Sequence, residues 1–218
     1  MSAAVVVRDA VLADAARCAR IYANYVNNTA ISFETEPPSA QEMAHRITRS
    51  QAAHAWLVAD VAGAVVGYAY ATSHRDRDAY RFACDVSVYV DENATGRGVG
   101  RLLYAALLAR LEEAGYRMAC AGISLPNPAS EALHRSFGFV DVGVYRRIGW
   151  KQNRWHDVLW LQRPLGVAER HDGERVPDGN PRSLRVLEKS GFTVVDQDVG
   201  YAAGRGADVS ELPLRRDT

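Results

Sequence analysis

The stretch that decides the fold runs Val86-Ser-Val-Tyr-Val90, a short polar turn, Thr95-Gly-Arg-Gly-Val-Gly100, and then Arg101-Leu-Leu-Tyr-Ala-Ala-Leu-Leu-Ala-Arg-Leu-Glu-Glu-Ala114. This pattern is typical of a buried strand that leads through a glycine-rich turn into an amphipathic helix. The first N–H groups of a helix have no partner within it, and the helix dipole adds partial positive charge there. Because glycine has no Cβ, the main chain can approach a phosphate closely. The stretch therefore predicts a site for a phosphorylated cofactor.

The spacing of the glycines limits which cofactor this turn can hold. Gly96, Gly98 and Gly100 are spaced G-x-G-x-G, which matches neither a Walker loop nor a dinucleotide fingerprint. The unit also lies inside the chain rather than opening a βαβ nucleotide fold. On these residues alone, a plain tight turn ahead of a good helix start stays open as the alternative.

Composition narrows the class of protein. The 218 residues allow one large domain or one domain with an appendage, and 48% hydrophobic with 24% charged residues is ordinary for a globular protein. A net charge of zero gives no indication of a nucleic-acid or membrane-surface partner, and no apolar run reaches the length of a membrane span. Cys18, Cys84 and Cys120 are odd in number and scattered, so we expect reduced thiols in a cytoplasmic protein rather than disulfides or a metal site.

Hydrophobic periodicity and turn residues predict the element order β-α-α-β-β-β-α-β-α-β-β, which is a mixed α/β sheet with helices on both faces. The expected strands cover 5–8, 55–60, 64–71, 83–90, 118–123, 139–146 and 155–161. The expected helices cover 12–27, a segment capped by Ser39, the segment that ends at Ala114, and 130–137.

Further strings make a family resemblance specific. Asn127-Pro-x-Ser130 and Leu133-His-Arg-Ser-Phe-Gly-Phe139 follow the strand–turn–helix unit, and this order resembles the GNAT superfamily of N-acetyltransferases. Within it, five collinear strings over about residues 5–163 are similar to the phosphinothricin and methionine-sulfoximine acetyltransferases: Phe33-Glu-Thr-Glu-Pro37, Trp56-Leu-Val-Ala59, Arg77-Asp-Ala-Tyr80, Ser87-Val-Tyr-Val90 and Trp155-His-Asp-Val158. The resemblance implies a mostly antiparallel GNAT-type sheet, acetyl-coenzyme A as donor and a small amine as acceptor.

The resemblance also implies where coenzyme A binds. Its pyrophosphate would contact the turn and the helix start, which comprise Gly96, Arg97, Gly98, Val99, Gly100 and Arg101. Thr95 stands where the family usually has Arg or Gln, but the backbone cradle does not depend on that side chain. The main chain of Val88, Tyr89 and Val90 would align the pantetheine arm, which Asn127 would also meet. The strand before the turn is expected to carry a bulge and to splay from the next strand, which leaves a free N–H near Val88 or Tyr89 for the thioester oxygen.

Two residues are the expected catalytic groups. Asp85 lies where the similar enzymes have a glutamate, so it would accept the ammonium proton, directly or through a water. The alternative for this acid is an ion pair with Arg81 or Arg77. His134 would protonate the leaving thiolate, whereas a lone histidine on a short helix can also be structural.

For the acceptor, the resemblance points to Phe33, Arg77 and Tyr80, with Arg77 able to clamp a carboxylate. A solvated, self-paired charge run over residues 75–78 is the alternative. The expected substrate is the α-amine of a compound such as phosphinothricin or methionine sulfoximine. A protein N-terminus, a polyamine, or a non-catalytic acyl-coenzyme A-binding module are the other readings. The similar enzymes are often dimers, so we expect a homodimer.

The chain beyond residue 165 changes character. We expect an acetyltransferase domain over 1–165, a linker over 166–179 and a partial repeat over 180–218. The repeat is indicated by Asn180, Pro181, Ser183, Gly191 and Phe192, which reproduce the spacing of Asn127, Pro128, Ser130, Gly138 and Phe139. Leu187 stands in the place of His134, so this copy has no proton donor.

Overall fold

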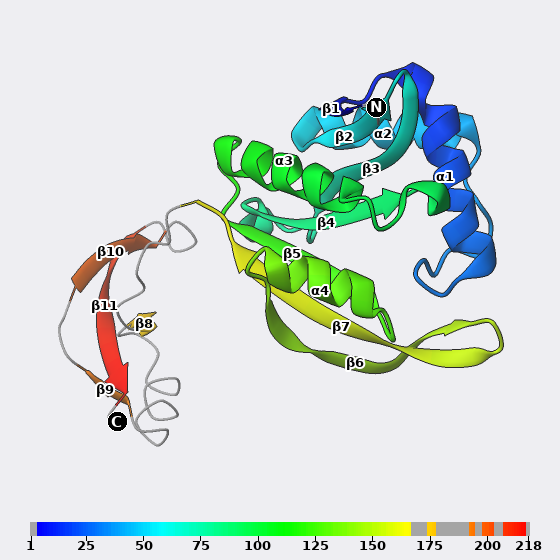
Figure 1. The fold of residues 1–218 in the computed structure, drawn as a ribbon. Helices are drawn as coiled ribbons and strands as arrows, with labels where there is room; N and C mark the ends of the chain where they lie inside the picture. Colours follow the sequence, from blue (N-terminus) through cyan, green and yellow to red (C-terminus); the bar gives the residue numbers. More distant parts are fainter. Residues whose placement is uncertain (1–3, 167–173, 178–191, 195–197, 203–206, 217–218) are drawn as a thin grey trace. The chain divides into compact units, whose positions relative to one another are not determined.

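A computed structural model of the chain describes residues 4–166, 174–177, 192–194, 198–202 and 207–216 (Figure 1). The chain divides into two units, Met1–Val167 and Ala168–Thr218. Among the described residues, no helix combines the length and the apolar character that crossing a membrane requires.

The first unit contains the expected elements in the expected order. Its strands are β1 Val5–Asp9, β2 Trp56–Val61, β3 Ala64–Ser73, β4 Ala83–Val90, β5 Met118–Ser124, β6 Val140–Lys151 and β7 Arg154–Pro164. Its helices are α1 Ala15–Asn28, α2 Ala40–Ala53, α3 Val99–Glu113 and α4 Pro128–Ser136, with 3-10 turns at Leu12–Asp14, Asp78–Tyr80 and Glu92–Ala94. The closing strands β6 and β7 are longer than expected, because they form one extended hairpin.

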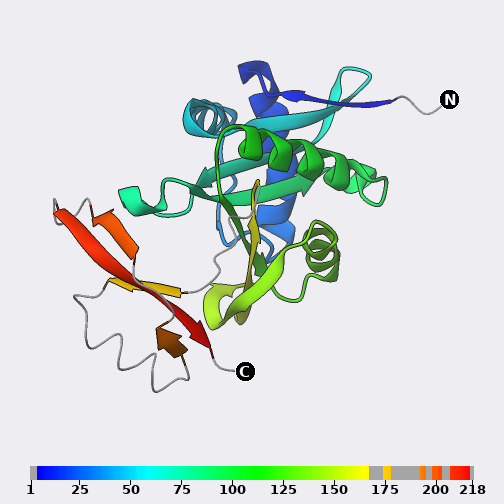
Figure 2. The same ribbon diagram turned by 90° about the vertical axis from the view of Figure 1, so that its left-hand side faces the viewer.

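The strands form one seven-stranded sheet in the order β1-β2-β3-β4-β5-β7-β6. Within this sheet β4 and β5 run parallel, and every other neighbouring pair is antiparallel. The helices cover both faces, with α3 and α4 opposite α1 and α2 (Figures 1 and 2). The expected mixed, mostly antiparallel α/β fold is therefore confirmed.

Side-chain alternation along β3 divides the core between the two faces. Ala69 and Ala71 pack in a cluster with Leu103 and Leu107 of α3, whereas Tyr68 packs with α1 and α2. Successive strand side chains point to opposite faces, so one strand supplies both cores. The helices are thereby fixed on a common sheet.

The central feature of the sheet is the parting of β4 from β5. The two strands pair only through Ala83↔Met118, Cys84↔Ala119 and Asp85↔Cys120. Beyond that point β4 continues in register with β3 as far as Val90, and β5 continues with β7 as far as Ser124 (Figure 1). The expected splay is therefore present.

The bulge expected in β4 is absent, and that expectation was wrong. The register between β3 and β4 runs unbroken from the pair Ser73↔Cys84 to the pair Gly67↔Val90. The gap opens because each strand follows its other neighbour, so no extra residue is needed to push β4 aside.

Helix α3 packs so closely on β3 that Gly67 has no room for a side chain. An added Cβ would stand 3.0 Å from the carbonyl oxygen of Tyr89, 3.2 Å from Leu103 and 3.3 Å from Val99. Val99 is the first residue of α3, so this contact also fixes the glycine turn relative to the sheet.

We expect Gly67→Ala to lower the free energy of unfolding by roughly 1–3 kcal/mol, because the added methyl group overpacks the β3–α3 contact. Chemical denaturation measures this loss. Gly143→Ala is the matched control, since a Cβ there meets nothing within 4 Å. Equal unfolding midpoints for the two variants would contradict the close contact.

The second unit forms a small antiparallel sheet. Strands β10 Asp198–Ala202 and β8 Glu174–Pro177 flank β11 Ala207–Arg216, and β9 Phe192–Val194 also pairs with β11. Residues 174–177 were expected to be part of the linker. They form β8 instead and pair with β11. Most of the residues that indicate the partial repeat lie outside the described residues, and the partial repeat over 180–218 stays a prediction.

Candidate active site

The glycine turn has the geometry of an anion cradle. Gly96 and Gly98 have φ angles of +73° and +79°, a conformation that favours glycine, and Gly98 caps α3. The N–H of Leu102 donates to the Gly98 carbonyl at 3.1 Å. The preceding amides of the first helical turn therefore have no acceptor within the helix. A diphosphate fits this arrangement.

The side chains around the turn differ in their freedom to contact a phosphate. The Thr95 hydroxyl donates to the Glu92 carbonyl at 2.9 Å, so it turns away from the cradle. The Arg101 guanidinium donates to Ser136 at 3.0 Å and lies over the Phe137 ring, which ties the turn to α4. Arg97 is exposed beside the cradle.

The gap between β4 and β5 encloses a cavity of about 60 Å³. It brings together four of the residues expected from the sequence, namely Val88, Tyr89, Asn127 and His134. Asn127 also caps α4, because its side-chain oxygen accepts from the N–H of Ser130 at 3.2 Å. The cavity thus lies between β4, which leads to the glycine turn, and α4, which carries His134.

The Tyr25 side chain hydrogen-bonds to both backbone groups of Val90 on β4. Its hydroxyl donates to the Val90 carbonyl at 2.6 Å and accepts from the Val90 N–H at 3.2 Å. Backbone groups alternate in direction along an antiparallel strand, so the N–H of Val88 faces the same side as that of Val90. Of the two amides expected to be free, Val88 is therefore the better placed.

His134 is buried and held at both ring nitrogens. Its Nδ1 lies 2.7 Å from the Ser130 carbonyl oxygen, which can only accept, so Nδ1 carries the proton. In the neutral ring, Nε2 then accepts from the Tyr104 hydroxyl at 2.7 Å. Burial lowers the pKa of His134, which favours this neutral form.

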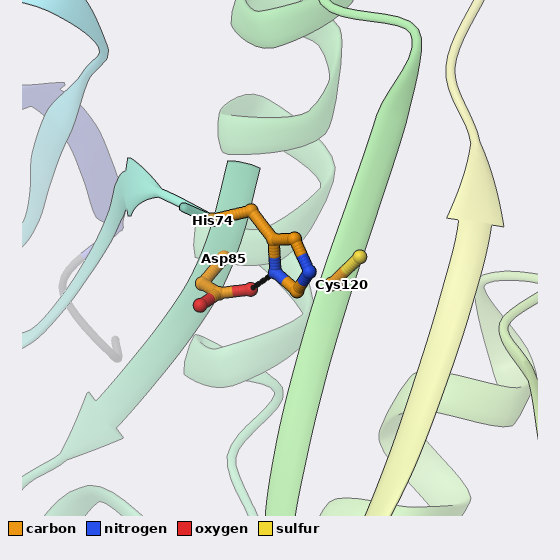
Figure 3. A group of neighbouring side chains, drawn as sticks. All are labelled: His74, Asp85 and Cys120. Carbon is orange, nitrogen blue, oxygen red and sulfur yellow. Dashed lines mark hydrogen bonds and ion pairs between the residues drawn. The ribbon is translucent and has the colours of Figure 1, made fainter. Parts of the chain in front are cut away.

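Asp85 has a partner that was not expected. The Nδ1–H of His74, the residue after β3, donates to Asp85 Oδ1 at 2.7 Å (Figure 3). The suggested pairing of Asp85 with Arg81 or Arg77 is therefore wrong. Burial raises the pKa of the Asp85 carboxyl, and the hydrogen bond from His74 acts in the opposite direction. The His74 ring also contacts Tyr80 and Trp160 edge-on, so its orientation is fixed.

A second cavity, of about 510 Å³, lies against Asp85. Its apolar wall includes Phe33, Tyr145, Ile148 and Trp160. The two cavities share wall residues on both sides of the gap: Ile31, Val86, Ser87, Gly122 and Ser124. A bound acceptor here would therefore adjoin a group bound in the gap.

The acceptor residues expected from the sequence are placed differently from one another. Phe33 lines the cavity with Asp85, whereas Tyr80 is not in its wall and packs edge-on against the His74 ring. Arg77 is exposed and does not line this cavity. A larger cavity of about 670 Å³ beside α2 contains none of the expected site residues in its wall.

Lys151 holds the loop that carries Phe33. Its ammonium group donates to three carbonyl oxygens, those of Val26 at 2.6 Å, Ser32 at 2.7 Å and Glu34 at 2.8 Å. The β6–β7 hairpin is thereby fastened to the loop over the acceptor cavity. Neither Lys151 nor His74 was singled out from the sequence, because no local pattern marks a residue whose partners are distant in the chain.

Comparison with known proteins agrees with this geometry. The family model described as an acetyltransferase (GNAT) domain matches residues 7–160. A phosphinothricin N-acetyltransferase from Alcaligenes faecalis is 42% identical over 151 residues, which are 68% of this chain and 77% of that protein. A methionine sulfoximine/methionine sulfone acetyltransferase from Pseudomonas aeruginosa is 38% identical over 158 residues, covering 72% of this chain and 92% of that protein.

A solved structure is similar as well. It is the crystal structure of a GNAT phosphinothricin acetyltransferase from Sinorhizobium meliloti in complex with acetyl-coenzyme A. The sequence identity is 41% and the TM-score 0.72, over 76% of this chain and 90% of that chain.

The fold and the cradle define an acyltransferase of the GNAT class. The chain belongs to the GNAT acetyltransferase family, and it is an N-acetyltransferase that uses acetyl-coenzyme A. The family resemblance inferred from the collinear strings is therefore confirmed.

We expect His74→Phe to move the acid limb of the pH–activity profile to higher pH. With Asp85 as the expected base, activity should fall as the pH drops through the pKa of Asp85, because a base works only when deprotonated. Without the donor from His74, burial acts unopposed and that pKa rises further. The measurement is kcat/KM against pH in the presence of a chelator.

The matched control for this variant is His74→Asn, which keeps an N–H donor near the position of Nδ1. Its acid limb should lie closer to that of the native protein. Coincident limbs for the native and His74→Phe proteins would exclude an influence of His74 on Asp85.

We expect Lys151→Met to raise KM for the acceptor about tenfold, because hydrogen bonds to a charged group are worth about 1.5–3 kcal/mol and their loss frees the Phe33 loop. KM for acetyl-coenzyme A should change little, since the glycine turn is remote from this contact. Arg154→Met removes an exposed cation from the same hairpin and serves as control. Equal effects on both KM values would contradict a loop-positioning role.

Proposed function

We propose that this acetyltransferase acetylates the α-amine of a small amino-acid-like compound of the phosphinothricin, methionine sulfoximine or methionine sulfone type. The observation that carries the proposal is the half-buried carboxylate of Asp85 in the wall of the 510 Å³ cavity, next to the gap where a thioester would lie. The names of the relatives support the acceptor class.

Each part of the reaction has a candidate group. The amides at the start of α3 would hold the pyrophosphate, with Arg97 and Arg101 nearby. The N–H of Val88 faces the gap and would stabilise the oxyanion that develops on the thioester oxygen. Asp85 would accept the proton from the acceptor's ammonium group, which frees the amine for attack.

The leaving thiolate needs a proton, and we assign it to His134. The neutral ring carries its proton on Nδ1, which donates to the Ser130 carbonyl. A neutral imidazole is too weak an acid for this step, so the ring would first take up a proton at Nε2, which would then donate to the Tyr104 oxygen. The imidazolium would give its Nδ1 proton to the thiolate in place of the Ser130 carbonyl and return to the neutral form. His134 therefore combines a structural contact with the proposed acid role.

For the rest of the acceptor, the apolar wall with Phe33 would cover a short side chain. Arg77 and Tyr80 do not line the cavity, so their proposed contact with the acceptor's carboxylate requires the segment that carries them to move toward it. They lie on the segment that follows His74, whose ring Tyr80 already touches. A bidentate guanidinium–carboxylate pair would give this class of acceptor its selectivity.

Two wider assignments accompany this function. A homodimer is supported by apolar side chains on the β6–β7 hairpin that are about half exposed, among them Val142, Ile148, Trp150 and Trp155. A cytoplasmic location is supported by the three cysteines, which are all buried and free.

We expect the native protein to release free thiol from acetyl-coenzyme A when supplied with phosphinothricin, methionine sulfoximine or methionine sulfone. Asp85→Asn should lower kcat/KM by about 10²–10⁴-fold, because it removes the general base, and His134→Ala by a smaller factor in the same range. Asp76→Asn, which changes an exposed acid after β3, is the matched control and should stay near the native value.

Two results would contradict the proposal. Coenzyme A release that is unaffected by Asp85→Asn would remove the catalytic base. Turnover of an alanyl peptide or a polyamine, with none of the three amino-acid analogues, would overturn the acceptor class.

A further inference from the structure

Three metal-binding residue types converge at the point where β4 and β5 part. His74 follows β3, Asp85 lies on β4 and Cys120 lies on β5, so they come from three neighbouring strands (Figure 3). Asp85 and Cys120 are partners in the last rung of the β4–β5 ladder. One ligand atom from each of the three residues lies within 4.8 Å of the other two.

The distances suit a small cation after a minor adjustment of side chains. A tetrahedral ion with bonds of about 2.0–2.3 Å to N, O and S holds its ligand atoms about 3.3–3.8 Å apart. The 2.7 Å contact between His74 Nδ1 and Asp85 Oδ1 is a hydrogen bond, so Nε2 is the ring nitrogen free to bind an ion, and its edge of the ring faces Cys120 (Figure 3). Asp85 must release this hydrogen bond and turn toward Nε2 to become the third ligand. The ladder and the fixed imidazole ring hold the three residues at this spacing without any ion.

The donor set selects the class of ion. A thiolate and an imidazole favour Zn²⁺ and similar borderline-soft cations, whereas Mg²⁺ and Ca²⁺ prefer oxygen ligands. Three protein ligands leave a fourth position for water, as in open zinc sites. Asp85 lines the acceptor cavity, so that position is reached from the cavity.

The charges around the cluster are mixed. The positive charge of Arg75 acts on both Asp85 and Cys120, and it weakens the attraction of these two groups for a cation. Burial raises the pKa of the Cys120 thiol to about 11, and the thiol must lose its proton to become a ligand. Both effects point to reversible uptake rather than a permanently filled structural site.

We propose that His74, Asp85 and Cys120 bind one divalent cation of the Zn²⁺ class, and that the bound ion blocks acetyl transfer by occupying Asp85. The binding site stands on the geometry of the cluster alone. The block rests on the proposed function, because it follows from Asp85 acting as the base. The expectation that the chain has no metal site, drawn from the scattered cysteines, is replaced here.

Binding is tested with Co²⁺ on the untagged, reduced full-length protein in the absence of substrate. The native protein should take up one ion and show the near-ultraviolet charge-transfer absorption that a thiolate ligand gives to Co²⁺. Cys120→Ser should lose this absorption, and His74→Phe should bind at least about tenfold more weakly. Calorimetry with Zn²⁺ provides the stoichiometry.

The matched control is Cys84→Ala. Cys84 is next to Asp85 in sequence, but it faces the opposite side of the sheet and packs in the α3 core. This variant should keep the Co²⁺ absorption of the native protein. Circular dichroism of each variant confirms that the fold is retained.

The block is tested by adding Zn²⁺ during turnover. Native activity should fall and return with a chelator, and Mg²⁺ should have no effect. The activity of Cys120→Ser, compared with its own metal-free value, should resist Zn²⁺ at concentrations that stop the native enzyme.

Distinct results would overturn each part. No thiolate absorption in the native protein, or its equal loss in Cys84→Ala and Cys120→Ser, would overturn the site. Tight binding without any loss of turnover would overturn the block. A metal-free protein that acetylates nothing would contradict the proposed function, while the Co²⁺ titration would still decide the site.

Discussion

Strands β4 and β5 share only three rungs, and the site is built around the place where they part. Beyond the Asp85↔Cys120 pair, β4 stays with β3 and β5 stays with β7. A sheet that opens in its middle leaves backbone groups without partners, and an unsatisfied buried amide costs about 1–3 kcal/mol. Tyr25 satisfies Val90, whereas Val88 faces a cavity of about 60 Å³. An extended ligand with its own amide groups can satisfy that edge.

The parted strands would be of little use if the phosphate cradle moved independently. Strand β4, the glycine turn and α3 follow one another directly in the chain, and Gly67 lets α3 rest on β3 without an intervening side chain. The two ends of a long cofactor would therefore meet one rigid unit. Catalytic groups on strands and helices are held more precisely than groups on loops.

Asp85, which lies where β4 and β5 part, is partly buried and has a specific partner in His74. Burial raises the pKa of Asp85, and the hydrogen bond from His74 moderates that rise. A carboxylate in this setting stays available as a base, yet it keeps some affinity for protons. The same neighbours, together with the Cys120 thiol, form a donor set for a soft cation. Asp85 would thus take part both in the proposed acetyl transfer and in its inhibition by a bound cation.

The sequence by itself determined the order and type of the elements, the glycine turn and the family. These depend on periodicity, capping and contiguous strings, all of which are local. The tertiary structure decided the unbroken register of β4, the partner of Asp85, the loop contacts of Lys151 and the position of Cys120. His74 is 11 residues from Asp85, and Lys151 is 117 to 125 residues from its three acceptors. Only strand pairing and loop path bring such residues together, and no local pattern in the chain encodes them.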